Sequence, residues 1–235
     1  MKLTKLFIFV LSLLTLSSCA TITPNFSVKQ DFWNDKTKVI GVAIGDMPNP
    51  TTHKSGSQGL LDMAINNANA GDLETHLNSL DVSKINNVAD KITAYLKGKG
   101  LRVKRISERV DIESLKEVEA QNDDAKKVYY GSRDYSPLKN KYGIDKIVLI
   151  NIVRIGTIRN YYGFIPLGAP KGLSHLGGYI INLDTNQLEW KQSVVQTAPN
   201  AGGEWDTPPN FDGLTDSMYT AFNQSRNMLF NYFSQ

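Results

Sequence analysis

The apolar run at residues 147–150, Ile-Val-Leu-Ile, constrains the fold of this 235-residue chain more than any other feature. Consecutive apolar residues give a strand no polar side, which is typical of a central strand covered on both faces. Beyond residue 152 apolar and polar residues alternate, so a strand predicted over 144–159 should project past its cover at that end. The chain must therefore build a sheet with a layer on each side.

Other segments have the periodicity of strands and helices. A polar turn at residues 184–187 joins the last two strands as a hairpin. Strands are expected at residues 37–45, 101–106, 176–183 and 188–196, and helices at 58–70, 85–96, 111–118, 136–143 and 214–233. Residues 46–59 and 159–175 are expected to be loops.

The order of these elements predicts the fold class. Crossovers of this length between the first three strands make them parallel, and the hairpin adds antiparallel strands. We expect an α/β fold with a mixed sheet, in which three parallel strands and an antiparallel hairpin are covered by helices.

The N-terminus has the parts of a bacterial export signal. Lys2 and Lys5 precede an apolar run at residues 6–16. As a helix this run extends only ~16 Å, against a hydrocarbon core of ~30 Å, which favours a cleaved signal over a transmembrane helix.

Residues 16–19, Leu-Ser-Ser-Cys, resemble the lipobox of bacterial lipoproteins. The resemblance implies cleavage before Cys19 and attachment of diacylglycerol and an N-acyl chain there, with no other cofactor expected. Ala20 implies sorting to the outer membrane, with the domain in the periplasm. The alternative is an ordinary secretory signal with a chance cysteine. The expected division is a signal peptide at 1–18, a lipidated N-terminus and tether at 19–36, and one α/β domain at 37–235.

Composition excludes several classes of function. The formal net charge is only +3, and basic residues are mixed with acidic ones, which argues against a nucleic-acid partner. Cys19 is the single cysteine, so the chain has no intrachain disulfide, and its one sulfur is assigned to lipid.

No catalytic or metal constellation is visible in the sequence. Residues 56–59, Gly-Ser-Gln-Gly, do not match the G-x-S-x-G pattern of a nucleophile elbow. His53, His76 and His175 have no metal-ligand spacing. We therefore predict a protein that is not an enzyme.

The predicted loop at 159–175 holds the best candidate site. Loops are usually exposed, and exposed apolar clusters mark interaction surfaces. The alternatives are that these side chains fold back over an open end of the sheet, or that they contact a lipid surface. The candidate partner-binding residues are Tyr161, Tyr162, Phe164, Ile165 and Leu167.

The element order, in a chain with a lipobox, resembles the N-terminal domain of TolB and its relatives. These include penicillin-binding-protein activator lipoproteins, an uncharacterised neisserial-type lipoprotein family and the curli secretion lipoprotein. The resemblance covers about residues 38–233 and rests mainly on 178–190. This stretch is similar to the hairpin of that group, in which an aliphatic strand enters an Asp-x-x-x-Gly turn and leaves through Leu-x-Trp. This chain has Asn186-Gln187 where glycine is usual. The members do unlike jobs, so the resemblance implies fold more than function.

Three functional hypotheses follow. The leading one is an outer-membrane lipoprotein whose non-enzymatic domain binds an envelope protein or itself. The second is a binder of a small ligand or peptidoglycan fragment, or a hydrolase, with its site in residues 46–59. The third is a structural subunit of a secretion or surface assembly.

Overall fold

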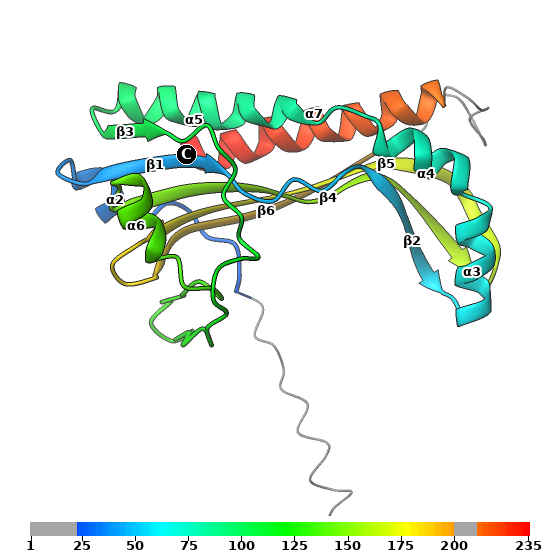
Figure 1. The fold of residues 1–235 in the computed structure, drawn as a ribbon, viewed down its shortest axis with the longest axis horizontal. Coiled ribbons are helices and arrows are strands. Elements are labelled where there is room, and N and C mark those ends of the chain that lie inside the picture. The colour runs from blue at the N-terminus through cyan, green and yellow to red at the C-terminus, as the bar shows by residue number, and fades with distance from the viewer. Residues whose placement is uncertain (1–22, 200–210) are drawn as a thin grey trace, which may run out of the picture.

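A six-stranded mixed sheet organises the chain in the computed structural model, which describes residues 23–199 and 211–235 (Figure 1). The strand order is β3-β1-β4-β5-β6, and β2 pairs with β4. The strands are β1 (Val39–Ile44), β2 (Thr51–Ser57), β3 (Arg102–Arg105), β4 (Lys146–Tyr162), β5 (Ile165–Asn182) and β6 (Leu188–Pro199). The helices are α2 (Gln30–Asn34), α3 (Leu60–Ala68), α4 (Gly71–Asn78), η2 (Ser83–Ile85), α5 (Asn86–Gly98), α6 (Pro137–Tyr142) and α7 (Asp212–Ser234).

The predicted fold class is confirmed. β1 runs parallel to both β3 and β4, while β4, β5 and β6 are successively antiparallel. β4 is the central strand that its apolar start predicts, because residues 147–150 are fully buried. The structure adds one strand that the sequence did not predict, since β2 pairs parallel with the far end of β4.

Two layers cover the two faces of the sheet. Helices α5 and α7 lie along one face (Figure 1) and bury apolar side chains such as Ile92 and Phe222. On the other face α6 and the irregular segment 106–135 cover a second cluster that includes Tyr129 and Leu138. Two separate apolar cores therefore hold the long part of the sheet.

The hairpin between β5 and β6 explains the motif around Trp190. A Cβ at Gly178 would lie 2.4 Å from the Trp190 ring, so the glycine makes room for this fully buried side chain. Asn186 adopts a φ of 61°, and asparagine tolerates this left-handed conformation. Its side chain also donates to the carbonyl oxygens of Gly131 and Arg133, which fixes the turn against the segment 106–135.

The far ends of β4 and β5 turn away from the two cores. β-Bulges interrupt their pairing between Ile152 and Arg154 and between Ile158 and Asn160. Between them Gly156 has a φ of 133°, and a Cβ there would lie 1.9 Å from the Thr51 carbonyl oxygen. Bulges and glycine bend strands. We call the projecting part, β2, α3 and residues 156–171 of the β4–β5 hairpin, the arm; it descends from the side opposite α5 and α7 (Figure 1).

Both predicted loops were wrong. Residues 46–59 contain β2, and residues 159–175 form the end of the β4–β5 hairpin. β2 reads Thr-Thr-His-Lys-Ser-Gly-Ser and has no apolar alternation. Its strand form depends on backbone pairing with β4, which a local pattern does not reveal.

The helix predicted at 111–118 was also wrong, because local hydrogen bonds compete with it. The Asp111 carboxylate accepts from the Ser114 backbone N–H, and the Ser114 hydroxyl donates to the Asp111 carbonyl oxygen. The Val118 N–H then donates to the Ser132 carbonyl oxygen. These bonds close a turn and a loop instead of a helix.

The predicted tether at 19–36 is packed on the domain in the part that the structure describes. The Phe26 N–H donates to the Lys191 carbonyl oxygen at 2.9 Å, beside β6. Phe32 of α2 is buried and contacts the core under α7. Residues 26–34 therefore belong to the folded unit, while Cys19 lies outside the described residues.

Candidate functional site

Helix α3 turns its apolar face to solvent, which is the reverse of an ordinary surface helix. Such a helix normally turns its apolar face to the core. Here Leu60 is 89% exposed and Leu61 73%, whereas Asn66 is only 2% exposed. The helix was predicted from the spacing of its apolar residues, and the structure shows that Leu60 and Leu61 face solvent.

Polar side chains attach α3 to the arm. The Asn66 amide donates to the Gln58 side-chain oxygen at 2.8 Å and to the Gly163 carbonyl oxygen at 3.2 Å. One turn earlier, the Asp62 carboxylate accepts from the Gly59 N–H at 2.8 Å and caps the helix. The inward face of α3 is thus its polar face, and a polar pair at i and i+4 in an apolar helix was the sequence signal for this orientation.

The end of the β4–β5 hairpin is apolar and exposed too. Tyr162, Phe164, Ile165 and Leu167 are exposed to between 52% and 70%, whereas Tyr161 is half-buried. Among residues 23–199 and 211–235 no layer covers these side chains, so four of the five predicted binding residues face solvent instead of folding back. The alternative in which they fold back is therefore not what the structure has.

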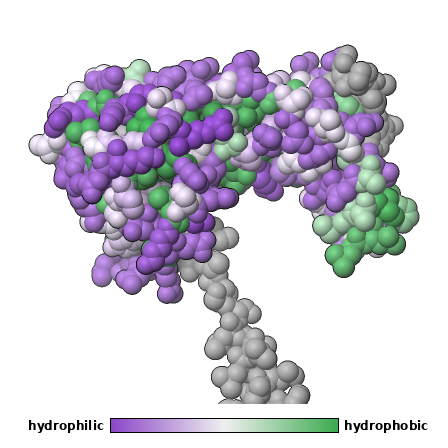
Figure 2. Space-filling model, in the orientation of Figure 1, coloured by the Kyte–Doolittle hydropathy of each residue, from purple (hydrophilic) through white to green (hydrophobic). Residues whose placement is uncertain are grey.

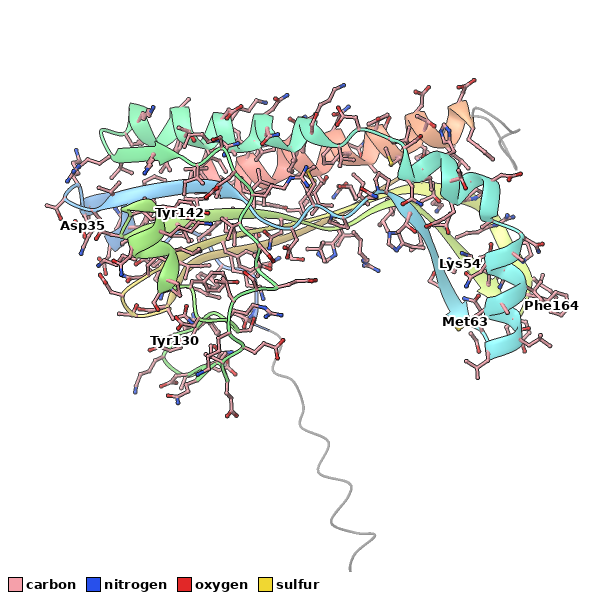
Figure 3. All side chains as sticks on the ribbon, in the orientation of Figure 1. Asp35, Lys54, Met63, Tyr130, Tyr142 and Phe164 are labelled. Atoms are coloured by element: carbon pink, nitrogen blue, oxygen red, sulfur yellow. The ribbon has the colours of Figure 1, made fainter. Side chains whose placement is uncertain are left out.

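Helix α3 and the hairpin end together form one surface, which we call the apolar tip. Figure 2 shows hydrophobic residues gathered at this end of the arm, and Figure 3 shows Met63 and Phe164 there. Eight of the eleven large apolar side chains exposed in the described part of the chain belong to it. The apolar tip consists of Leu60, Leu61, Met63, Ile65, Tyr162, Phe164, Ile165 and Leu167.

The apolar tip carries very little charge. Residues 55–61 and 160–170 contain no acidic or basic side chain, and Asp62 is the only ionisable group on α3. Basic residues follow directly behind the tip, with Lys54 on β2, Arg159 on β4 and Lys171 on β5. The tip of the arm is therefore uncharged apart from Asp62, and the part of the arm next to the tip is basic.

A cavity of about 270 Å³ lies along the arm and shares Phe164 with the apolar tip. Three β2 residues, Thr52, His53 and Lys54, line it, so part of the segment expected to hold a ligand site does border a cavity. The other lining residues are Asn66, Asn69, Ala70, Asp72, Leu73, Thr157, Arg159, Tyr161, Pro166, Pro170, Phe211 and Leu214.

The polar side chains in and beside the cavity form hydrogen bonds or lie near charged neighbours. Burial lowers the pKa of His53, whose Nε2 lies 3.2 Å from the Ile155 carbonyl oxygen. Burial also lowers the pKa of Lys54, although the nearby Glu74 carboxylate opposes that shift. For Glu74, burial raises the pKa, but hydrogen bonds from Thr51 and Thr52 outweigh it and leave the pKa lowered. This network favours a rigid wall over a reactive group.

The histidines serve separate parts of the fold. His53 contacts β4, His76 contacts the Thr215 hydroxyl at 2.7 Å, and His175 contacts the Ser193 hydroxyl at 2.7 Å. Within residues 23–199 and 211–235, no group of three or more His, Cys, Asp or Glu side chains could hold a metal ion. No described helix is both long and apolar enough to cross a membrane.

No family model and no curated protein sequence matches the chain. Among solved structures it is similar to protein XCC0632 from Xanthomonas campestris, with a TM-score of 0.35 and 11% identity over 89% of this chain and 86% of that one. It is also similar to lipoprotein GNA1162 from Neisseria meningitidis, with a TM-score of 0.26 and 13% identity over 81% of this chain and 99% of that one. The hypothetical protein CT253 from Chlamydia trachomatis has a TM-score of 0.34 and 9% identity over 83% and 96% of the two chains. TM-scores below 0.5 carry no argument about function, so the TolB resemblance stays a prediction.

Proposed function

We propose that this chain is a lipid-anchored protein of the bacterial cell envelope whose domain acts by contact and not by catalysis. The apolar tip is its contact surface. The observation that carries the proposal is the orientation of α3, which buries Asn66 and exposes Leu60 and Leu61. An exposed apolar patch costs free energy in water and marks an interaction site in soluble domains.

The proposed address comes from the N-terminus. A short apolar run followed by Leu-Ser-Ser-Cys supports lipidation of Cys19, and Ala20 supports an outer-membrane location with the domain in the periplasm. Two or three acyl chains hold a protein on a bilayer durably, since each buried CH₂ adds ~0.8 kcal/mol. A domain held in this way meets other envelope components at high local concentration.

Proteins of the envelope, or further copies of this chain, are the partners that the sequence favours. The test is crosslinking in the native host followed by mass spectrometry, with wild type, Leu61→Asp and Phe164→Asp compared. Val195→Ser is the matched control, because Val195 is an exposed apolar residue of β6 outside the tip. We expect both tip variants to lose crosslinks that the control keeps. Equal crosslinks in all four proteins would contradict a protein partner for the tip.

The cavity supports a second candidate function, the binding of a small ligand with a mostly apolar body. Its volume of about 270 Å³ is just below the usual range for ligand pockets, ~300–1,000 Å³. A thermal-shift screen against muropeptides, nucleotides and metals tests this. A rise in Tm that Thr157→Phe removes, by filling the cavity, would support it, and no shift with any compound would count against it.

A further inference from the structure

We infer that the apolar tip inserts into the phospholipid surface to which the chain is anchored, so that the domain is held at two points. This inference rests on the proposed function, because it gives the tip a specific partner. Three observations carry it: the place where the N-terminal segment joins the domain, the direction of the arm, and the chemistry of the tip.

The N-terminal segment limits the distance between anchor and domain. Thr23 lies against the domain, since its carbonyl oxygen accepts from Lys191 Nζ and its hydroxyl lies 3.4 Å from the Asn122 amide. Cys19 precedes it by four residues, which span at most ~14 Å when fully extended. A lipid on Cys19 therefore keeps the membrane surface close to the part of the domain that carries Thr23.

The arm reaches toward the same side. Figure 1 shows the N-terminal segment of the described chain and the arm on one side of the long sheet, with α5 and α7 on the other. Asn122, the neighbour of Thr23, belongs to the segment 106–135 that covers this side. With Cys19 in a bilayer, the arm points at the lipid and the α5–α7 layer points away from it.

The chemistry of the tip suits the boundary between acyl chains and headgroups. Leucine, isoleucine and phenylalanine side chains partition into the acyl region, and tyrosine favours the interface. The backbone is hydrogen-bonded within the tip, as in the bond from the Gly163 N–H to the Ser57 carbonyl oxygen at 2.8 Å, which satisfies the polar groups that lipid cannot. Lys171, exposed on β5 behind the tip, is placed for phosphate groups.

A protein partner would not require this pattern. Protein interfaces carry a polar rim and hydrogen bonds at their surface. The outward side chains of residues 60–65 and 162–167 are almost entirely apolar over two adjacent elements. Two-point attachment gives the domain one orientation on the membrane, which a flexible lipid anchor alone does not impose.

The test uses the mature chain, residues 19–235, with Cys19→Ser, so that no acyl chain contributes. Residues 1–18 are the predicted signal peptide, so this chain is the form expected at the membrane. Cys19 is the only cysteine, hence Leu61→Cys in this background gives one site for an environment-sensitive fluorophore. Vesicles of phosphatidylethanolamine and phosphatidylglycerol are the probe, read by flotation and by the blue shift of the label.

We expect the protein to float with the vesicles and the label to shift to the blue. Leu61→Asp and Phe164→Asp should each lower vesicle affinity by about tenfold or more, because a carboxylate is costly in the apolar layer. Val195→Ser should bind as wild type does. Matching Tm values would exclude unfolding as the cause, and these side chains are exposed enough to make that outcome expected.

Two results would overturn the inference. Absence of vesicle binding by wild type is one, and equal binding by wild type and the Asp variants is the other. Vesicle binding can fail while the crosslinks described above still depend on the tip; the contact role then stands and its partner is a protein. If the wild type does not bind vesicles and its crosslinks do not depend on the tip either, the proposed function fails as well. Light scattering without vesicles identifies a second copy as partner if wild type dimerises and Leu61→Asp does not.

Discussion

The side-chain amide of Asn66 donates to the carbonyl oxygen of Gly163 at 3.2 Å and thereby joins α3 to the turn of the β4–β5 hairpin. Through this bond and the one to Gln58, the two elements of the apolar tip form a single surface. A buried polar group, and not an apolar core, therefore holds the arm together.

Asn66→Ala should loosen α3 without unfolding the domain. It removes both hydrogen bonds, each of which typically contributes ~0.5–1.5 kcal/mol. Hydrogen exchange read by mass spectrometry should become faster in residues 58–68 and stay unchanged in α7. The neighbouring Asn67 is exposed, so Asn67→Ala is the control. Unchanged exchange in the Asn66 variant would mean that other contacts hold α3.

Gly156→Ala should disrupt the bend of the arm. Its φ of 133° is strained for any side chain, and the added Cβ would collide with the Thr51 backbone. We expect β2 to detach from β4 and the Tm to fall. Gly98→Ala is the matched substitution at an open helical position, with nothing within 4 Å of the added Cβ. It should stabilise α5 by ~0.5–1 kcal/mol. Equal Tm changes in the two variants would refute the role of Gly156.

The free energy of unfolding should fall when either partner of the Lys146–Glu189 ion pair is lost. Lys146 Nζ lies 2.7 Å from a Glu189 carboxylate oxygen, and both residues are buried. Lys146→Met leaves a buried carboxylate uncompensated, which typically costs ~3–5 kcal/mol. The double variant Lys146→Met, Glu189→Leu removes both charges and should recover most of that loss. Urea unfolding of the wild type and of both variants measures this, and a double variant no more stable than Lys146→Met would contradict the coupling.

Stability should fall between about pH 7.5 and pH 5.5 because of two histidines on either side of Arg154. Burial lowers the pKa of His53 and of His175, and the Arg154 charge lowers both further. The unfolded chain therefore takes up these protons first, near the ordinary histidine pKa of ~6.5. Their contribution is fully present above that pH and is lost as the pH falls through it.

The double variant His53→Gln, His175→Gln isolates this effect. Its Tm should fall less than the wild-type Tm over the same pH range, while both proteins keep a constant difference above pH 7.5. If the two Tm curves stay parallel throughout, the histidines do not cause the acid sensitivity.

Much of the fold was predictable because its signals are local. The apolar run at 147–150 marks a strand buried on both faces, and Pro137 with Gly143 marks the start and end of α6. The spacing of apolar residues in 214–233 indicates the buried stripe of α7. Each of these depends on residues that are neighbours in the chain, and so do the lipobox-like pattern at residues 16–19 and the tyrosine- and phenylalanine-rich segment at 161–167.

The candidate site was only half visible for the opposite reason. Tyr162 and Phe164 were chosen for their composition, but Leu60 and Leu61 were not, because an amphipathic pattern shows that a helix has two faces and not which face is covered. β2 had no strand pattern and forms through backbone pairing with β4. By itself the sequence determined the parallel order, the two-sided cover and the leader-like N-terminus. Tertiary structure alone decided that α3 turns its apolar side outward, because residues distant in the chain, Asn66 and Gly163, satisfy each other's hydrogen bonds inside the arm.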